Sequence, residues 1–387
     1  MNPFGIYVHW PYCVAKCPYC DFNSHVRERI DEDRWTRLVE TELTAMAQLR
    51  SDWPHVSSIF FGGGTPSLMS GRTTAKLLDT ISRLWKISAT AEITLEANPN
   101  SVEREKFSDY RAAGVNRVSI GVQSFDDVAL GQLGRAHSSK EAIHAIVSAT
   151  SIFPRVNFDL IYARPGQTIA NWVGELNKAL RFGTEHLSLY QLTIEQGTAF
   201  AALHRQGKIN MPDEDLAADF YEVTQDICGA AGLPAYEISN HARPGQESRH
   251  NLLYWRYGDY AGVGPGAHGR LIIAGRRYAT VTERLPERWA ARVESTGRGF
   301  SLTEIPRREA AKEHLLMGLR ISEGINLKDF ASRWELRPSE ECLARLEDIN
   351  LIATGNSYLT VTNAGRLLLN RVTHELTESL VPETVVA

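Results

Sequence analysis

The chain has 387 residues, of which 43% are hydrophobic and 23% charged, and its formal net charge is −4 at pH 7. This composition is typical of a globular protein longer than one average domain, although barrels often exceed about 200 residues. The small negative charge argues against nucleic-acid binding, and no apolar run approaches the ~20 residues that a membrane span needs. A strand is predicted almost at the N-terminus, so no targeting peptide is expected and the predicted location is cytoplasmic.

The first two-thirds of the chain alternate β-rich runs with helical stretches. The predicted strands are 6–9, 56–61, 92–96, 117–121, 157–161 and 186–192. The predicted helices are 31–50, 72–85, 101–113, 138–149 and 168–182. This α/β alternation predicts a parallel sheet with helices outside, and six units rather than eight predict a partial, open (β/α)6 barrel. In such folds the chemistry collects at the C-terminal ends of the strands.

Three cysteines, Cys13, Cys17 and Cys20, follow the first predicted strand with the spacing C-x3-C-x2-C. Thiolates can anchor three irons of a 4Fe–4S cluster and leave the fourth iron open to a small molecule. A zinc site would need a fourth ligand, for which His9 and His25 are the nearest candidates. A disulfide is disfavoured, because the chain has five cysteines in all, an odd number, and no secretory signal precedes the motif. The sequence therefore predicts an open cluster in a reducing compartment.

A glycine-rich run, Gly62-Gly63-Gly64-Thr65-Pro-Ser, follows the second predicted strand. Adjacent glycines let the backbone approach a ligand closely, although such a run is by itself often only a turn. The run lacks the Lys-Ser/Thr of a phosphate-binding loop, which disfavours a nucleoside triphosphate.

Polar side chains come at the ends of the next predicted strands, where each could also be an ordinary cap or turn residue. They are Glu96, Gln123 with Ser124, Arg135 and Asp159. Together they place two carboxylates, an amide and a guanidinium around one rim. An amino acid joined to a ribose would need this mixture, because an acid can bind an amine or ribose hydroxyls and arginine suits a carboxylate.

The rest of the chain divides into two further predicted regions after a barrel over 1–235. Helical spacing predicts a core-facing helix over 213–231, in which Cys228 is a buried thiol. Residues 236–305 are predicted to be an irregular extension, with a long irregular segment over 235–269. Residues 306–387 are predicted to form a mainly helical, winged-helix-like domain that also holds a structural Cys342. Its predicted helices are 307–320, 327–333, 339–348 and 363–377, with a strand at 357–361.

Four motifs taken together resemble the radical S-adenosylmethionine (radical SAM) superfamily, and more narrowly its HemN/HemW branch, over essentially the full chain. They are C-x3-C-x2-C with Tyr19, Gly62-Gly-Gly-Thr-Pro-Ser67, Glu96-Ala-Asn-Pro99 and Gly121-Val-Gln-Ser-Phe125. The resemblance implies that the three cysteines carry a 4Fe–4S cluster whose open iron chelates the amino and carboxylate groups of S-adenosylmethionine. It also implies an accessory domain of the HemN C-terminal type.

The resemblance further assigns cofactor-binding roles to individual residues. It places Gly62, Gly63 and Gly64 along the methionine moiety, Glu96 near the methionine end, Arg135 at the carboxylate, and Gln123 and Asp159 at the ribose. Thr65 belongs to the same glycine-rich motif, and Tyr7 and His9 match the Tyr-x-His-x-Pro-x-Cys sequence that precedes the cysteines in this branch.

The branch contains two functions of different class. One is oxygen-independent coproporphyrinogen III dehydrogenase, a radical enzyme that decarboxylates propionates, and the other is a heme chaperone that passes heme to apo-hemoproteins. The dehydrogenase motif carries a further cysteine two residues after the third, where this chain has Phe22. The dehydrogenase also has an N-terminal extension that helps to build its substrate site, whereas only twelve residues precede Cys13 here. His250-Asn-Leu-Leu-Tyr-Trp255 is similar to the H-N-x-x-Y-W motif of the chaperones. The resemblance therefore favours the chaperone, with a homodimer and membrane-bound recipients as further expectations.

His250 is the leading candidate for a heme ligand, because imidazole is a common axial ligand and aromatic neighbours suit a porphyrin face. The alternative is that Tyr254 and Trp255 pack in the core and His250 satisfies a loop carbonyl. His268, in the following glycine-rich run, is a second candidate.

One motif departs from the branch. Many relatives have Gly-Leu-Pro-Gly after the fifth strand, where this chain has Ala163-Arg164-Pro165-Gly166. The lost glycine is expected to restrict the backbone to negative φ and to change the path of this loop.

Overall fold

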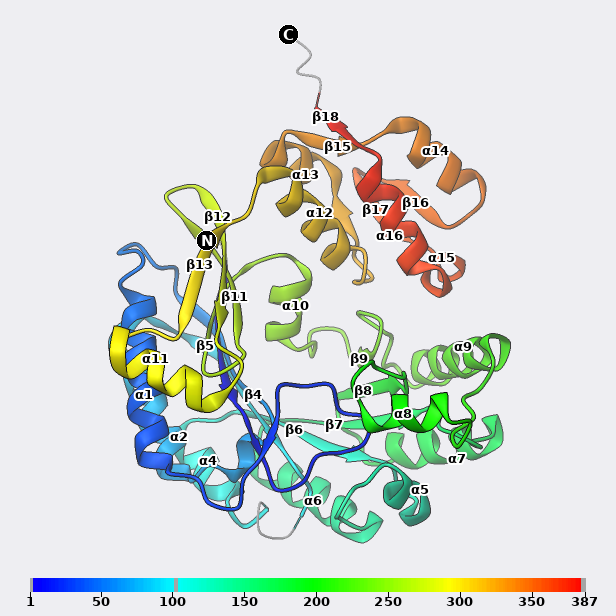
Figure 1. Cartoon of the computed structure of the whole chain (residues 1–387). Coiled ribbons are helices and arrows are strands. Elements are labelled where there is room, and N and C mark those ends of the chain that lie inside the picture. The colour runs from blue at the N-terminus through cyan, green and yellow to red at the C-terminus, as the bar shows by residue number, and fades with distance from the viewer. Residues whose placement is uncertain (1–2, 101–103, 384–387) are drawn as a thin grey trace.

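A parallel sheet forms the centre of the computed structural model, which describes residues 3–100 and 104–383 (Figure 1). Six strands lie side by side in chain order and run parallel: β1 (Phe4–Trp10), β4 (Val56–Gly63), β5 (Ile87–Ala97), β6 (Arg117–Gln123), β7 (Arg155–Tyr162) and β8 (His186–Gln191). All six predicted strands are confirmed. The sheet stays open, because its outermost strands, β13 (Phe300–Glu304) and β9 (Asn240–Ala242), do not pair with each other in the described residues.

Helices connect these strands and cover the outside of the sheet (Figure 1). They are α1 (Glu32–Ala47), α2 (Gly71–Leu84), α4 (Phe107–Ala113), α5 (Asp127–Gln132), α6 (Ser139–Ile152) and α7 (Ile169–Leu180). Several begin at a side-chain cap: Asp31, Ser70, Ser138 and Thr168 each accept a hydrogen bond from a first-turn N–H group. Of the predicted helix over 101–113, α4 covers the last part, and residues 101–103 lie outside the described residues.

The two faces of the sheet have different chemistry. Along β1 the residues Phe4, Ile6, Val8 and Trp10 are fully buried in the core under the helices. Successive side chains of a strand point to opposite faces, so Tyr7 points to the inner face. Because the outer face is packed with apolar side chains, the polar residues of the strands gather on the inner face.

Residues 235–269 are not the irregular segment that the sequence predicts. They contain β9, α10 (Arg249–Trp255), β10 (Asp259–Val263) and the start of β11 (His268–Ile273). These elements are three to seven residues long and glycine-rich in places, so their periodicity was too short to detect.

The extension over 236–305 widens the sheet to eleven strands within the described residues. β10 pairs in parallel with the free edge of β1, and β11, β12 (Arg276–Thr282) and β13 continue in antiparallel order. α11 (Pro286–Thr296) then packs beside α1 on the outer face. β1 therefore lies inside the sheet and not at its edge.

Two polar contacts tie this extension to the N-terminal part of the chain. The buried carboxylate of Glu42 accepts hydrogen bonds from the N–H groups of Gly264 (2.7 Å) and Gly299 (2.9 Å) and from Trp289 Nε1 (3.0 Å). Burial raises the pKa of Glu42 to about 7. The amide of Asn23 donates to the carbonyls of Pro265 and Arg284, each over 2.9 Å.

Two more helices precede the extension: α8 (Ala199–Arg205) and α9 (Glu214–Ala230). α9 confirms the helix predicted over 213–231, and its Cys228 is fully buried as expected. No helix in residues 3–100 or 104–383 is both long and apolar enough to cross a membrane.

The C-terminal region is mainly helical and surrounds a second hydrophobic core (Figure 1). Its helices are α12 (Arg307–Gly318), α13 (Leu327–Trp334), α14 (Glu340–Asp348), α15 (Asn363–Leu367) and α16 (Leu369–Glu378). Its short strands are β14 (Ile325–Asn326), β15 (Leu336–Pro338), β16 (Ile352–Gly355), β17 (Tyr358–Val361) and β18 (Leu380–Pro382). The helix predicted over 363–377 is broken at Leu368, and Cys342 is buried as predicted.

Candidate functional site

The three motif cysteines line one cavity of about 400 Å³ at the C-terminal ends of the central strands. Cys13 ends the short strand β2 (Tyr12–Cys13), which pairs with β3 (His25–Val26), and Cys17 and Cys20 lie in the loop between them. The other two cysteines, Cys228 and Cys342, lie in separate buried environments. The structure therefore brings together the three thiols of the motif and no others of the chain's five.

Hydrogen-bond donors surround these sulfur atoms. Thr65 Oγ1 donates to Cys13 Sγ over 3.3 Å, and Arg135 Nη1 donates to Cys17 Sγ over 3.5 Å. Burial raises the pKa of Cys13 and of Cys20, so thiolates there need a cation to compensate their charge. Three sulfurs facing one cavity, with a hydroxyl and a guanidinium aimed at two of them, fit a cluster held by thiolates.

The glycine-rich run forms the end of β4 and leads into the turn η1 (Pro66–Leu68), and it packs directly against the chain that enters the cysteine loop. A Cβ on Gly64 would lie 2.6 Å from the carbonyl oxygen of Tyr12, and Gly63 has a φ of 112°, so both positions need glycine. Gly63, Gly64 and Thr65 line the cavity, whereas Gly62 lies beneath the rings of Phe60 and Tyr7.

Two carboxylates face the cavity from neighbouring parts of the inner face. Glu96 accepts a hydrogen bond from the N–H of Gly63 over 3.3 Å, and Asp159 accepts from Ser119 Oγ and Asn157 Nδ2, each over 3.2 Å. Burial, and for Glu96 also the nearby Asp159, raises the pKa of Glu96 to about 8 and that of Asp159 to about 6. Such a pair favours a cationic ligand, because the cation restores the ionised form of each acid.

We therefore expect the affinity for S-adenosylmethionine, a sulfonium cation, to rise with pH between about 5 and 9. Both carboxyl groups are protonated below their raised pKa values, and binding a cation to a protonated acid must release a proton, so affinity increases as pH rises through about 6 and then 8. Isothermal titration calorimetry at several pH values tests this, with S-adenosylhomocysteine, which has a neutral thioether in place of the sulfonium, as the matched ligand. Glu96→Gln should flatten the upper part of the profile. An equal slope for both ligands would contradict the expectation.

Arg135 and Gln123 complete the rim of the cavity. Arg135 Nη2 donates to Asn98 Oδ1 (2.6 Å) and to the carbonyl of Gly121 (2.9 Å), which fixes the guanidinium beside Cys17. Gln123 has a φ of 67°, and the register of β6 shifts at this point. A register shift and a residue with positive φ change the direction of a side chain. Here the amide of Gln123 lies over Gly121, where a Cβ would come within 2.9 Å of Gln123 Nε2.

Tyr7 and His9 lie on the inner face of β1 but are not among the residues that line the cavity. The hydroxyl of Tyr7 and His9 Nδ1 share a hydrogen bond of 2.9 Å, and His9 Nε2 bonds the carbonyl of Asn23 over 2.9 Å. Both ring nitrogens of His9 are thus engaged. His25 does not line the cavity either, so neither histidine is placed to complete a zinc site with the cysteines.

His250 lies away from the cysteine cavity, under the inner face of the sheet. Its side chain is 1% exposed, Nδ1 bonds Ser58 Oγ over 2.8 Å, and Nε2 bonds the hydroxyl of Tyr254 over 2.6 Å. The ring also stacks on Phe60, with centroids 5.1 Å apart. In this conformation iron cannot reach either nitrogen, and the arrangement matches the alternative that these residues pack in the core.

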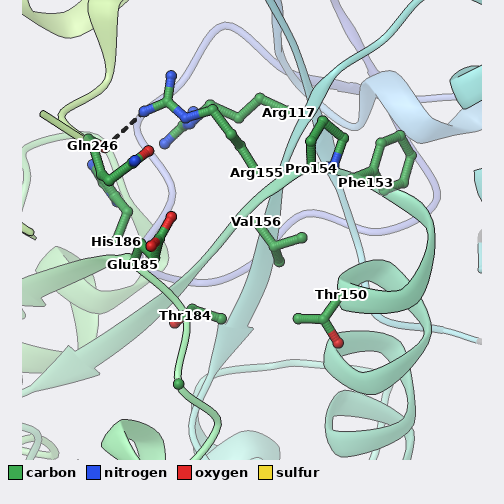
Figure 2. Close-up of a pocket in the computed structure, with 11 residues that line it drawn as sticks. Arg117, Thr150, Phe153, Pro154, Arg155, Val156, Thr184, Glu185, His186 and Gln246 are labelled. Carbon is green, nitrogen blue, oxygen red and sulfur yellow. Dashed lines mark hydrogen bonds between the residues drawn. The ribbon is translucent and has the colours of Figure 1, made fainter.

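A second cavity, of about 220 Å³, opens at the opposite end of the strands, where β6, β7 and β8 begin (Figure 2). Arg117, Arg155 and His186 line it, each the first residue of its strand. Both arginines pair with the buried carboxylate of Glu92, which also accepts a hydrogen bond from the N–H of His250 over 3.2 Å. The ion group of Glu92, Arg117 and Arg155 therefore supports the start of α10, at the end of the sheet opposite the thiols.

The loop after β7 follows a path that the sequence did not predict. Ala163 has a φ of 54°, so it adopts the left-handed conformation usually taken by glycine, and the expected restriction to negative φ is wrong. Arg164 holds the loop in place by pairing with the buried Glu175 over 2.7 Å, and Glu175 also accepts hydrogen bonds from Ser124 Oγ and Phe125 N.

Some residues that line the cavity were given no role at the site from the sequence, although two of them stand within the quoted motifs. They include Tyr19, Asn98, Ser119, Tyr190 and the segment that follows β8. Tyr190 stands near the end of the sixth predicted strand, so the same strand-end argument that found Asp159 could have found it. Asn98 was visible in the Glu-Ala-Asn-Pro motif, but its contact with Arg135 depends on the folded rim.

Two family models match the chain. Residues 7–179 match the radical SAM superfamily, and residues 305–368 match the HemN C-terminal domain.

Curated relatives match most of the chain. A mouse protein named radical S-adenosyl methionine domain-containing protein 1, mitochondrial, is 41% identical over 327 residues, which cover 83% of this chain and 74% of the relative. The heme chaperone HemW of Escherichia coli (strain K12) is 43% identical over 292 residues, covering 74% and 75%. HemW of Mycobacterium tuberculosis (strain H37Rv) is 37% identical over 382 residues, covering 97% and 95%.

Among solved structures, coproporphyrinogen III oxidase (HemN) from Escherichia coli, described as a radical SAM enzyme, is similar with a TM-score of 0.81. The match covers 97% of this chain and 90% of HemN at 22% sequence identity. At that identity the likeness shows that the two chains share a fold.

Proposed function

Because the chain belongs to the radical SAM superfamily, in the branch that contains HemW and HemN, we propose that it is a heme chaperone that binds heme and delivers it to apo-hemoproteins. The observation that carries this proposal is the similarity to relatives named heme chaperone over almost the whole chain. Phe22, which stands where the dehydrogenases carry a further cysteine, supports it.

The chain's own residues supply a cofactor site for this function. Cys13, Cys17 and Cys20 would hold a 4Fe–4S cluster, with Thr65 and Arg135 donating to two of the sulfurs. Glu96, Gln123, Arg135 and Asp159 would hold S-adenosylmethionine at the same rim. When bound, the cluster and S-adenosylmethionine supply one-electron chemistry, while the heme is the cargo.

A dehydrogenase of the HemN type is the second candidate function. The shared fold supports it, because a TM-score of 0.81 over 97% of the chain includes both the sheet and the C-terminal region. The two candidates differ in what happens to a porphyrin: a chaperone releases heme unchanged, whereas a dehydrogenase converts coproporphyrinogen III.

We expect the cluster-loaded protein to take up heme and to pass it to an apo-hemoprotein, without turnover of coproporphyrinogen III. Heme uptake is followed by the Soret band, transfer by recovery of the recipient's spectrum, and turnover by release of carbon dioxide in the presence of S-adenosylmethionine and a reductant. Free heme at the same concentration is the control for unassisted transfer. Rapid decarboxylation would instead establish the dehydrogenase.

The partners and location follow from the same proposal. The recipients would be apo-hemoproteins, including membrane-bound ones, and the chain would work as a homodimer. The cytoplasmic location also stays a prediction, because the names of some relatives include the word "mitochondrial".

A further inference from the structure

His268 differs from His9 and His250, the other histidines described on the inner face of the sheet, in the bonding of its ring. His268 begins β11 and is exposed, and within the described residues its ring makes no hydrogen bond or ion pair. Both ring nitrogens of this exposed side chain are therefore available to a metal, which imidazole binds through either nitrogen. His250 differs from it in exposure and in bonding, because His250 is buried and both of its ring nitrogens are engaged.

The strand pairing places His268 on the face that carries the cofactor residues. Tyr260 on β10 is in register with Gly5 on β1, so it shares the inner face with Tyr7. Tyr260 lies opposite Arg270 on β11, and His268 is two residues from Arg270 on the same face.

The loop before His268 touches the cysteine loop. Asn23 donates to the carbonyl of Pro265, and a Cβ on Gly266 would lie only 2.2 Å from the Asn23 amide. Phe22, the neighbour of Asn23, lines the cysteine cavity and is 61% exposed. His268 and Phe22 are therefore both at the cysteine end of the sheet, joined by a direct packing contact between their loops.

The residues around His268 suit the iron, the porphyrin ring and a propionate of heme. Val281, directly opposite on β12, is 37% exposed and, together with Phe22, offers apolar surface to a porphyrin ring. Arg284 lies beside the loop that precedes His268, because its carbonyl and that of Pro265 both accept hydrogen bonds from the Asn23 amide, and its side chain makes no ion pair in the described residues. A free guanidinium suits a propionate, and a neutral imidazole suits the iron.

We propose that His268, not His250, is the axial ligand of the transported heme, which lies over the inner face of β11 and β12 with a propionate on Arg284. This inference rests on the proposed chaperone function, because that function supplies the heme. His250 then has a structural role: it holds α10 against β4 through Ser58 and Phe60.

Spectroscopic heme titration of the cluster-loaded, full-length protein tests the assignment. We expect His268→Ala to remove the imidazole signature from the heme-specific difference and resonance Raman spectra. It should also weaken binding by at least about tenfold, a loss that even residues supporting a metal ligand can cause. His144→Ala, at an exposed histidine on α6, is the matched control and should bind heme as the wild type does. His250→Gln, which can retain a hydrogen bond to Ser58, should keep the imidazole signature.

Chemical rescue with imidazole distinguishes the loss of a heme ligand from structural damage to the protein. In His268→Gly, added imidazole should restore the heme spectrum, because the small ligand can occupy the place of the lost side chain. The inference is overturned if His268→Ala keeps the wild-type spectrum and affinity, if added imidazole fails to restore the His268→Gly spectrum, or if His250→Gln alone loses the imidazole signature. If the wild-type protein binds no heme, the proposed function itself fails, which is a distinguishable result.

Discussion

Replacing Cys17 by serine is expected to abolish the iron–sulfur cluster. The structure gives the three thiols one shared cavity, and the two remaining cysteines are buried in other cores, so no other thiol of this chain can substitute. Losing one of three anchors leaves two irons of a four-iron cluster without a protein ligand. After anaerobic reconstitution, Cys17→Ser and Cys17→Ala should both lack the brown visible absorbance and retain little iron and sulfide.

Cys342→Ser is the matched control for this experiment. It also changes a cysteine to serine, but at a position in α14 in the C-terminal core. It should keep the full iron content. If both Cys17 variants hold as much iron and sulfide as the wild type, or if Cys342→Ser loses the cluster, the assignment of the thiols is wrong.

A large loss of stability is expected from Glu92→Gln. The Glu92 side chain is 1% exposed and pairs with Arg117, whose side chain is 3% exposed, and with Arg155. The neutral amide keeps the size of the side chain but leaves two guanidinium groups without a buried counter-charge. Removing one partner of a buried ion pair costs about 3–5 kcal/mol, because the charge left behind is desolvated.

Denaturant unfolding compares this variant with Glu304→Gln, which removes the carboxylate of an exposed pair with Arg276. Exposed pairs contribute about 0–1 kcal/mol, so the control should shift the midpoint little. Equal shifts for the two variants would show that the ion group under α10 is not a stability determinant. Loss of the Glu92 carboxylate should also loosen the start of α10, which hydrogen exchange at the His250 amide, a donor to Glu92, can detect.

How much the sequence predicts depends on how local each feature is. The thiols lie within eight residues, so their spacing alone predicts that they meet. The carboxylates Glu96 and Asp159 were found because the C-terminal ends of parallel strands share one rim. Both kinds of argument use only short-range pattern and the geometry of a parallel sheet.

Features that depend on distant segments were not predictable in this way. The role of His250 is decided by Ser58, which lies 192 positions away in the chain. The strand β10 was missed because its short, partly glycine pattern becomes a strand only when β1 offers an edge to pair with. The path through Ala163 depends likewise on the buried pair of Arg164 and Glu175.

The contact between the cysteine loop and the extension has a consequence for how the protein is made. Asn23 bonds the carbonyl of Pro265, 242 positions later, and β1 gains its second neighbour only from β10. A ribosome must therefore synthesise more than two-thirds of the chain before the thiols have their final surroundings. At about 5–20 residues per second, a nascent chain spends many seconds with its cysteines exposed and one edge of β1 unpaired. Cluster insertion is thus expected to follow synthesis of the extension. Until then the thiols of the nascent chain depend on a reducing environment or a bound chaperone for protection from oxidation.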